Sequence, residues 1–256
     1  MKISLLIPFY NEVDTIREYD HMLFPIVDEI MREYKYDYEY VFMDDGSVDG
    51  SQTDLVEYIT KSKQLTEKSV VLSHTSNRGL GKTIRDGIEE CKGDYIIIMD
   101  ADLSYRPASI RDMLECLKLN PDVDCISSSP YMYPHLVRGM DSNIRYWGSI
   151  YFNKVYSWII GQNITCATSM FRLYKSNILK NKKLRSDGFD ISAEILSKFI
   201  LGGKKVIEIP VTLYGRDYGI SKMKVIYETR RGIEMIVKIY LKKNFPNIYT
   251  TFFERV

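Results

Sequence analysis

Two pairs of aspartates in the first half of the chain directly follow apolar runs. Asp44 and Asp45 are adjacent, and a single alanine separates Asp100 from Asp102. Carboxylates repel an anionic diphosphate, so they approach such a ligand through a hard cation. Mg²⁺ and Mn²⁺ prefer oxygen ligands, and Mg²⁺ is usually held by one or two carboxylates together with substrate phosphates. The spacing of Asp100 and Asp102 therefore predicts a divalent-metal site that serves a phosphorylated substrate.

The elements that must position these carboxylates are short apolar strands. Four runs are interpreted as buried strands: 3–8, 39–43, 69–73 and 94–99. Helix-like segments lie between them: 15–35, 49–63 and 81–91. Pro25 breaks the first of these helices. Strands that alternate with helices predict a mostly parallel sheet, and continuously apolar strands predict helices on both faces.

Polar clusters follow three of the predicted strands, at 8–12, 44–47 and 100–102. Asp, Gly and Ser are also common in ordinary strand-end turns. Ligands of parallel sheets bind outside the carboxyl ends of the strands, where these clusters fall. Three acidic clusters on one sheet edge favour a binding site over simple turns.

The chain is less regular after Asp122. The sequence predicts a strand over 125–128, an aromatic-rich helix over 143–160 and a late strand over 206–213. Pro210 places this last strand at an edge of the sheet or ends it. No repeat or low-complexity linker is present, so we expect one α/β domain over residues 1–225 and a C-terminal extension over 226–256.

Composition excludes several classes of protein. The net charge of +1 over 256 residues gives no indication of nucleic-acid binding. The cysteines form no C-x-x-C pair and have no histidine at ligand spacing, so no zinc site is expected. No apolar run approaches the roughly 18 residues that span a bilayer, and the N-terminal apolar stretch is too short for a signal peptide. We expect a cytoplasmic location.

Several motifs carry a family resemblance. Its N-terminal part consists of Pro8–Glu12, Asp44–Gly50, Asn77–Lys82, Gly93–Tyr95 and Asp100–Ser104. Its C-terminal part consists of Phe171–Tyr174, Gly188–Phe189 with Glu194, and Arg216–Lys222. The first group resembles family-two glycosyltransferases, and the second resembles dolichyl-phosphate mannose synthases and related polyprenyl-phosphate glycosyltransferases. Across residues 1–225 this resemblance implies a GT-A-like single domain, a Rossmann-like sheet flanked by helices.

The resemblance also implies roles for individual residues. Those implied to bind the nucleotide sugar are Pro8, Tyr10, Glu12, Asp44, Asp45, Lys82, Asp100, Ala101 and Asp102. Those implied to hold Mg²⁺ or Mn²⁺ are Asp100, Asp102 and Ser104. Those implied to bind an acceptor phosphate are Arg145, Ser149, Arg216, Ser221 and Lys222. The catalytic set would be Asp100, Asp102, Arg216 and Lys222.

The implied reaction is inverting transfer of a sugar to a polyprenyl or dolichyl phosphate. GDP-mannose is the donor that the resemblance favours, and UDP-glucose fits the same motifs. A phosphate acceptor has a second pKa near 6 and is already ionised at neutral pH, so it needs no general base. A sugar hydroxyl acceptor would need one, and Glu194 or Asp190 would be the candidates.

Two departures from the family pattern concern the acceptor. Pro130 occupies the position of a family arginine, and Cys166 the position of a family aspartate. Arg138 is one arginine that could replace the first. A sugar or polysaccharide hydroxyl therefore remains an alternative acceptor. A catalytically silent binding protein is a further alternative, which the intact Asp100 and Asp102 oppose.

The C-terminal segment 222–256 mixes basic and apolar residues in an amphipathic pattern. That pattern is typical of a helix that binds an anionic membrane surface, and equally of a helix that packs on the domain with a solvated basic face. A separate membrane-anchoring partner is a further alternative. The expected location is thus the cytoplasm, with peripheral association at the cytoplasmic face of a membrane.

Overall fold

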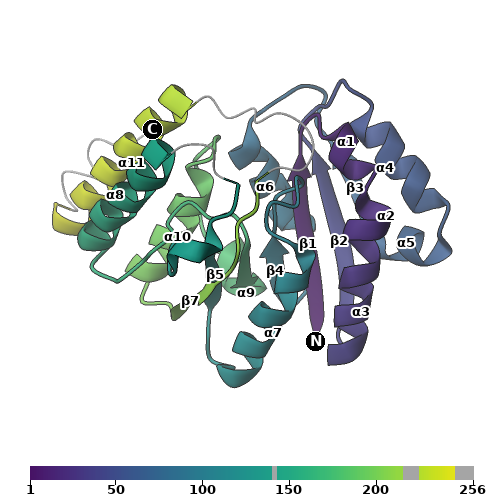
Figure 1. The fold of residues 1–256 in the computed structure, drawn as a ribbon, viewed down its shortest axis with the longest axis horizontal. Coiled ribbons are helices and arrows are strands. Elements are labelled where there is room, and N and C mark those ends of the chain that lie inside the picture. Colours follow the sequence, from purple (N-terminus) through teal and green to yellow (C-terminus); the bar gives the residue numbers. More distant parts are fainter. Residues whose placement is uncertain (140–142, 216–224, 246–256) are drawn as a thin grey trace.

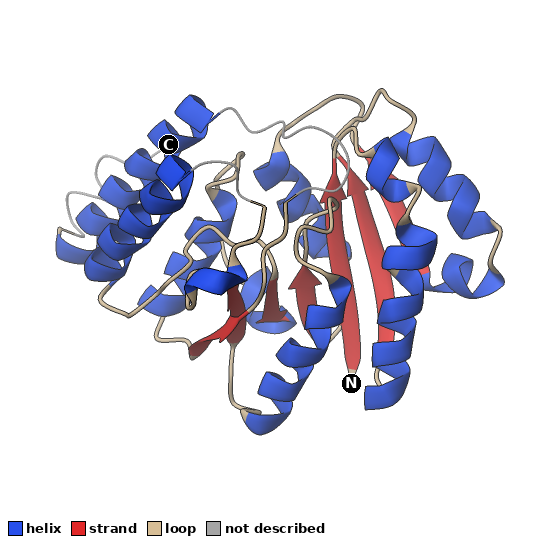
Figure 2. Cartoon of the chain, in the orientation of Figure 1, coloured by secondary structure: helices blue, strands red, loops and turns tan. Residues whose placement is uncertain are grey.

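A seven-stranded sheet runs through the protein in the order β3-β2-β1-β4-β6-β5-β7 (Figures 1 and 2). The computed structural model describes residues 1–139, 143–215 and 225–245. The strands are β1 (Lys2–Phe9), β2 (Asp37–Asp44), β3 (Ser69–Ser73), β4 (Tyr95–Ile98), β5 (Cys125–Ser129), β6 (Arg172–Lys175) and β7 (Val206–Pro210). β6 runs antiparallel to both of its neighbours, and the other pairs are parallel. The loop that enters β6 therefore lies at the same edge as the carboxyl ends of β1, β2 and β4.

Helices cover both faces of the sheet. One face packs on α1 (Val13–Ile16), α2 (Tyr19–Met22), α3 (Phe24–Tyr34), α4 (Ser51–Thr60), α5 (Lys63–Lys68) and α7 (Ile110–Leu119). The other packs on α6 (Leu80–Glu90), α9 (Ser176–Lys180) and α10 (Ile191–Leu201). Two short 3₁₀ turns, η1 (Pro107–Ser109) and η2 (Pro134–Leu136), flank the later strands. The side chains of β1 alternate between the two apolar clusters, as expected of a central strand covered on both faces.

A third apolar cluster joins α8 (Asn143–Ile160), α10 and α11 (Val225–Asn244). Met235 and Ile239 on α11 are buried against Tyr156 and Ile160 on α8. Figure 1 shows α8 and α11 side by side at one end of the molecule. In the C-terminal segment, the inner face of α11 therefore packs on the domain, which is one of the two alternatives that the amphipathic pattern predicted.

Most predicted elements are present, with shifted ends. β3 and α8 have the predicted bounds, and Pro25 lies in the first turn of α3, where its missing N–H needs no partner. The late strand ends at Pro210 rather than at residue 213, and β7 lies at the edge of the sheet, as Pro210 predicts. β6 was not predicted, because the charged Arg172 interrupts its apolar run.

Arg172 is a fully buried cation in β6. Its guanidinium donates to Ser127 Oγ at 2.7 Å and to the carbonyls of Ser192, Cys166 and Ala167 at 2.6, 3.0 and 2.8 Å. A buried charge without such acceptors costs several kcal/mol. These bonds fix the loop that enters β6 against β5 and α10. Cys166 is itself buried in that loop.

Two helical glycines provide a matched test of how closely α6 packs against the loop before α10. A Cβ at Gly81 would lie 2.0 Å from the carbonyl oxygen of Ser186, whereas one at Gly148 on α8 would meet nothing within 4 Å. We expect Gly81→Ala to lower the free energy of unfolding by about 1–3 kcal/mol or more. Gly148→Ala should raise it by about 0.5–1 kcal/mol. Urea unfolding of both variants measures this, and equal effects would contradict the close approach at Gly81.

Candidate active site

The loops after β1 and β2 are joined by hydrogen bonds. Asn11 N donates to Ser47 Oγ, and Asn11 Oδ1 accepts from Val48 N, both at 2.8 Å. Glu12 N donates to Ser51 Oγ at 2.8 Å. Asn11 has a positive φ of 52°, which asparagine tolerates better than most residues. The first two polar clusters of the sequence are therefore held against each other at one sheet edge.

The loop after β4 is held from α2. The hydroxyl of the buried Tyr19 donates to the carbonyl of Ala101 at 2.8 Å. Asp102 Oδ1 accepts from Ser104 N at 3.0 Å. Between them the buried Leu103 has a φ of 53°, a strained value for a non-glycine residue and one that is typical of functional loops. The backbone around Asp102 is thus fixed before any ligand binds.

The residues with predicted donor and metal roles meet at this edge: Pro8, Tyr10, Glu12, Asp44, Asp45, Asp100, Ala101, Asp102 and Ser104. Burial raises the pKa of Tyr19 well above its usual value, and the charges of Glu12 and Asp102 add to the rise. Tyr19 therefore lies close enough to Glu12 in the first cluster and Asp102 in the third for both charges to act on it.

Two aspartates and a serine form a donor set that fits a hard cation. Asp100, Asp102 and Ser104 are partly exposed on one short loop. Among the described residues, no group of three or more His, Cys, Asp or Glu side chains is placed to hold a metal. Two carboxylates completed by substrate phosphates are an arrangement that Mg²⁺ commonly adopts. The set therefore fits Mg²⁺ or Mn²⁺.

Asp44 and Asp45 differ in what surrounds them. Burial raises the pKa of Asp44, and hydrogen bonds from Ser47 offset only part of that rise. Asp45 Oδ1 accepts from Arg78 N at 2.8 Å, and Oδ2 accepts from Gly79 N at 2.9 Å. Asp45 thus shapes the turn before α6.

His74 was not predicted to belong to the site. Its ring nitrogens lie 2.9 Å from Asp45 Oδ1 and 3.0 Å from Asp86 Oδ2, and the side chain is buried. Asp86 also pairs with Lys82 one turn away on α6. Burial opposes ionisation of Asp86, but bonds to Lys82 and His74 lower its pKa overall. Lys82, which was predicted to bind the nucleotide sugar, is therefore linked to Asp45 through Asp86 and His74. In the sequence, only the i,i+4 spacing of Lys82 and Asp86 indicated part of this chain of contacts.

The predicted acceptor residues are only partly described. Burial raises the pKa of Tyr131 to about 12, and a hydrogen bond with Ser149 on α8 opposes that rise. Arg145 lies in the first turn of α8, but its side chain is outside the described part. Arg216, Ser221 and Lys222 also lie outside the described residues. Their acceptor roles stay predictions.

The two candidate general bases are engaged elsewhere. Glu194 accepts from the backbone of Arg185 and Ser186 and pairs with Lys198. Burial opposes ionisation of Glu194, but these bonds lower its pKa overall. Asp190 pairs with Arg231 of α11 at 3.0 Å. Because its pKa is lowered, Glu194 is a poor general base.

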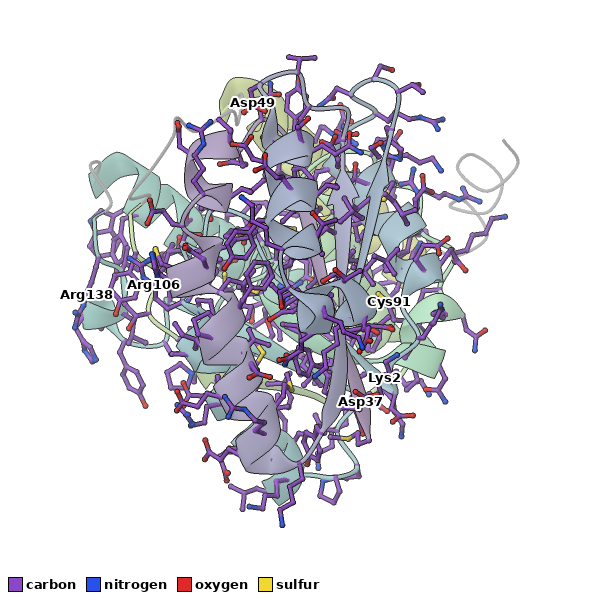
Figure 3. The ribbon with its side chains drawn as sticks, turned by 90° about the vertical axis from the view of Figure 1, so that its right-hand side faces the viewer. Lys2, Asp37, Asp49, Cys91, Arg106 and Arg138 are labelled. Carbon is purple, nitrogen blue, oxygen red and sulfur yellow. The ribbon has the colours of Figure 1, made fainter. Side chains whose placement is uncertain are left out.

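Two arginines approach one tyrosine beside the predicted metal loop. The guanidinium carbons of Arg106 and Arg138 lie 5.0 and 5.9 Å from the ring centroid of Tyr214. In Figure 3 both arginines are labelled on the same side of the molecule, away from Cys91. Tyr214 N donates to the carbonyl of Ser104 at 2.9 Å. Two cationic groups thus lie near Tyr214, whose backbone contacts the predicted metal loop.

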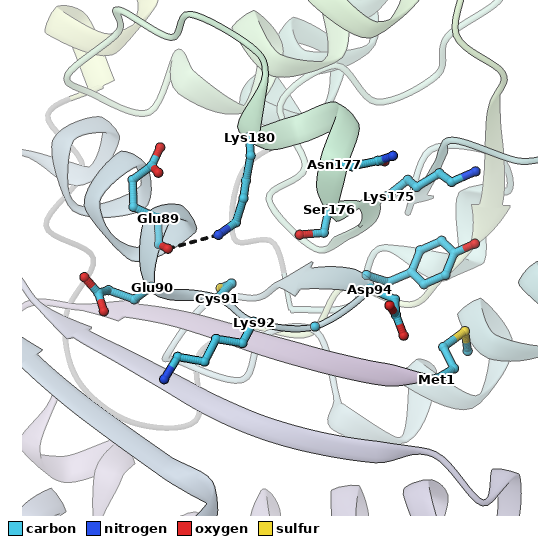
Figure 4. A pocket seen from close by; sticks show the side chains of 12 residues that line it. Met1, Glu89, Glu90, Cys91, Lys92, Asp94, Lys175, Ser176, Asn177 and Lys180 are labelled. Atoms are coloured by element: carbon cyan, nitrogen blue, oxygen red, sulfur yellow. Dashed lines mark hydrogen bonds between the residues drawn. The ribbon is translucent and has the colours of Figure 1, made fainter.

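A pocket of about 720 Å³ lies elsewhere, at the opposite edge of the sheet. Its lining includes Met1, Glu90, Cys91, Asp94 and Lys180 (Figure 4). Lys180 donates to the carbonyl of Glu89. The mixed charges of this lining select no ligand class, and the pocket is separate from the clusters described above.

The sequence model of one protein family matches residues 4–181, and its description is Glycosyl transferase family 2. The chain belongs to glycosyl transferase family 2. The dolichol-phosphate mannosyltransferase of Pyrococcus furiosus is 30% identical over 93% of this chain and 64% of its own length. An undecaprenyl-phosphate 4-deoxy-4-formamido-L-arabinose transferase of Pseudomonas fluorescens is 28% identical over 86% of this chain and 59% of its own. The chain therefore spans about three-fifths of the length of these relatives.

Solved structures share the fold of this family member. Glucosyl-3-phosphoglycerate synthase from Mycobacterium tuberculosis, in complex with Mn²⁺, UDP and phosphoglyceric acid, matches with a TM-score of 0.64 and 15% identity. The match covers 94% of this chain and 78% of that one. The same enzyme with Mg²⁺ and UDP gives 0.63. The expected GT-A-like fold and family are confirmed.

Glu194 allows a pH test of the loop that it holds. Its folded-state pKa is lowered, so its stabilisation is present above the unfolded pKa of about 4.3 and is lost as the pH falls through the folded value. Glu194→Gln should therefore lower the free energy of unfolding by about 1–3 kcal/mol at pH 7, and by less at pH 3. Denaturant unfolding at both pH values measures the difference. Glu57→Gln, on an exposed helix pair, is the control and should change little; a Glu194→Gln effect independent of pH would contradict the account.

Proposed function

We propose that this protein transfers a sugar from a nucleotide-sugar donor to a polyprenyl phosphate, with inversion at the anomeric carbon. The observation that supports this most is the meeting of three motif loops at one sheet edge, in a chain whose relatives include polyprenyl-phosphate sugar transferases. The mannosyltransferase among these relatives favours GDP-mannose as donor. The UDP-glucose complex of the M. tuberculosis enzyme makes a UDP-sugar the alternative.

A divalent cation belongs to this proposal. Asp100 and Asp102 would hold Mg²⁺ or Mn²⁺, with the Ser104 hydroxyl as a further oxygen ligand. When bound, the ion would act as a Lewis acid that stabilises the departing diphosphate. The bond from Tyr19 to Ala101 keeps the loop in place for it. The Mn²⁺ and Mg²⁺ complexes of the M. tuberculosis enzyme support the choice of metal.

The remaining residues divide between donor and acceptor. Pro8, Tyr10, Glu12 and Asp44 would contact the nucleoside. Asp45 would act indirectly, through the turn that it holds before Lys82. Predicted contacts to phosphate groups fall to Arg145, Ser149, Arg216, Ser221 and Lys222, and Arg216 and Lys222 would also stabilise charge during transfer.

The chemistry requires positioning more than proton transfer. An oxygen of the ionised acceptor phosphate attacks the anomeric carbon, and the bond from that carbon to the diphosphate breaks. The nucleoside diphosphate departs with the bonding electrons, and no proton has to be removed. The engagement of Glu194 and Asp190 in structural bonds supports this acceptor over a sugar hydroxyl, which would need a free base.

A membrane surface is the partner that this acceptor requires. Trp147, Tyr151 and Trp158 are 65, 72 and 75% exposed along one stripe of α8, with the exposed Lys154 between them. On the neighbouring α11, Ile233 and Val237 are also exposed. Tryptophan, tyrosine and lysine are typical of membrane interfaces. No helix in the described part of the chain is long and apolar enough to span a bilayer, so we propose peripheral binding at the cytoplasmic face through α8 and α11.

Asp102→Ala tests the reaction and its metal together. Protein, Mn²⁺ and labelled GDP-mannose or UDP-glucose are incubated with a polyprenyl phosphate, and label is counted in the organic phase. We expect metal-dependent label with the wild type, loss with EDTA, and a decrease of at least about 100-fold with Asp102→Ala. An active Asp102→Ala variant would contradict the metal assignment. Donor turnover without label in lipid would transfer the proposal to a hydroxyl acceptor, and no turnover would favour a silent binding protein.

The α8 stripe predicts a separate effect on membrane binding. Trp147→Ser combined with Trp158→Ser should weaken binding to phosphatidylglycerol-containing vesicles at least about tenfold. Each substitution removes the apolar area that the indole would bury in the membrane interface. Leu119 on α7 is 78% exposed, so Leu119→Ser is the control and should bind normally. Co-sedimentation measures both. Normal vesicle binding by the double variant would show that α8 does not face the membrane.

A further inference from the structure

His74 lies between carboxylates from two different elements, Asp45 directly after β2 and Asp86 on α6. We propose that His74 is a positioning residue for the donor: it fixes Asp86, which in turn holds the ammonium of Lys82 where the diphosphate of a nucleotide sugar binds. This inference rests on the proposed function, because it assumes a nucleotide-sugar donor. It gives a role to a residue that lies outside the motifs of the family resemblance.

His74 is fixed on three sides. Nδ1 lies 2.9 Å from Asp45 Oδ1, and Nε2 lies 3.0 Å from Asp86 Oδ2. The backbone N–H of His74 donates to the carbonyl of Asp44 at 2.9 Å. Only 7% of the His74 side chain is exposed. The ring therefore has little access to water that could replace either contact, and it links the two carboxylates directly.

The charges of this cluster balance when the His74 ring carries both protons. A neutral imidazole donates from one nitrogen, whereas an imidazolium donates from both. Both nitrogens face carboxylate oxygens, so the two hydrogen bonds form together in the imidazolium. The cluster then contains two carboxylates and two cations, since Lys82 pairs with Asp86. Without the charge of His74, both carboxylates would attract the ammonium of Lys82 and draw it inward.

The ammonium of Lys82 can bind a second anion while it pairs with Asp86. An ammonium has three N–H donors. Within the described part of the chain, Asp86 is the one hydrogen-bond partner of this ammonium. The Lys82 side chain is 30% exposed, so a ligand can reach it. A lysine held in this way presents a point charge that suits a phosphate oxygen.

The backbone beneath Lys82 has contacts of its own. Gly79, the residue before α6, has a φ of 91°, and the carbonyl of Asp187 lies where a Cβ on it would be. Gly81 N donates to the same carbonyl at 2.8 Å. The first turn of α6 therefore keeps its place when His74 is changed. What His74 determines is the orientation of the Lys82 side chain.

Asp45 connects this cluster with the loops that contain predicted donor residues. Its backbone N–H donates to the carbonyl of Phe9, within the polar cluster 8–12, at 2.8 Å. Its carboxylate accepts from Gly79 N at 2.9 Å, directly before the helix of Lys82. One aspartate is thus bonded to the end of β1 and to the turn that precedes Lys82. Lys82 therefore begins α6 at the same sheet edge as the donor loops.

Two substitutions of His74 separate its two ring contacts. The short amide of His74→Asn can replace Nδ1 toward Asp45 but does not reach Asp86. The longer amide of His74→Gln can replace Nε2 toward Asp86, without the charge. Calorimetry with GDP and with UDP, each with Mn²⁺, measures nucleotide binding. We expect His74→Asn to weaken binding of the nucleotide that the wild type prefers about fivefold or more, and His74→Gln to weaken it less.

A double variant tests whether His74 acts through Lys82. Lys82→Met should weaken nucleotide binding about tenfold or more, because a charged hydrogen bond to phosphate is lost. The variant that combines Lys82→Met with His74→Asn should bind within about twofold of Lys82→Met alone, because the effects of two residues that act in series do not add. Two exposed residues serve as controls: His21→Gln and Lys61→Met should match the wild type.

Enzyme assays add a readout that a general loss of stability would not give. With His74→Asn, the KM of the nucleotide sugar should rise about fivefold or more. The KM of geranyl phosphate, a short acceptor that needs no membrane, should change less than about twofold. Urea unfolding shows whether each variant folds. If His74→Asn does not fold, His74→Gln and its combination with Lys82→Met provide the same test.

Each contrary result has a distinct meaning. Unchanged nucleotide binding in His74→Asn, additive effects in the double variant, or no binding of either nucleotide by the wild type would each overturn the inference. Equal rises in the KM of the nucleotide sugar and of geranyl phosphate would assign His74 to the fold of the whole site, and would also overturn it. Nucleotide binding that depends on His74 through Lys82, without sugar transfer, would contradict the proposed function but support the inference.

Discussion

The crowding of carboxylates at the carboxyl edge of a parallel sheet is the constraint on which the rest of the structure depends. β1, β2 and β4 are adjacent and parallel, so their acidic loops must share that edge. Most of these charges are met by donors from the protein. Asp45 is satisfied by two backbone N–H groups and His74, and Asp49 by Ser51 and Val13. Asp100 and Asp102 are partly exposed and lie on one short loop, and their carboxylates are the donor set on which the metal proposal rests.

The reversal of β6 is a second constraint on this edge. Because β6 is antiparallel, its entry loop reaches the same edge as the loops that follow β1, β2 and β4. Arg172 holds that loop from within the core, and Glu208 on β7 accepts from Thr165 N and Cys166 N at 2.7 and 3.0 Å. The Cys166 residue is thus bonded to a cation through its carbonyl and to a carboxylate through its N–H. These two bonds hold the backbone at Cys166 in place without an aspartate at that position.

The sequence predicted what local patterns determine, and missed what only tertiary contacts create. Apolar runs gave the central strands, and the motif loops gave the sheet edge with Asp100 and Asp102. β6 was missed because a buried arginine looks polar in sequence, although its bonds make it a core residue. His74 was not predicted as a site residue, since nothing local in the sequence relates it to Asp45 and Asp86. The meeting of Arg106, Arg138 and Tyr214 joins three distant segments, which no spacing rule can anticipate.

The central claim is that a phosphate oxygen receives the sugar, and ³¹P NMR of the acceptor during turnover tests it most directly. The account predicts that the phosphate monoester signal of geranyl phosphate decreases while a sugar-linked phosphodiester appears. The couplings of the anomeric proton in this phosphodiester should show that the anomeric carbon has the configuration opposite to that in the donor. Consumption of the donor with an unchanged monoester signal, or a product that retains the donor configuration, would contradict the account.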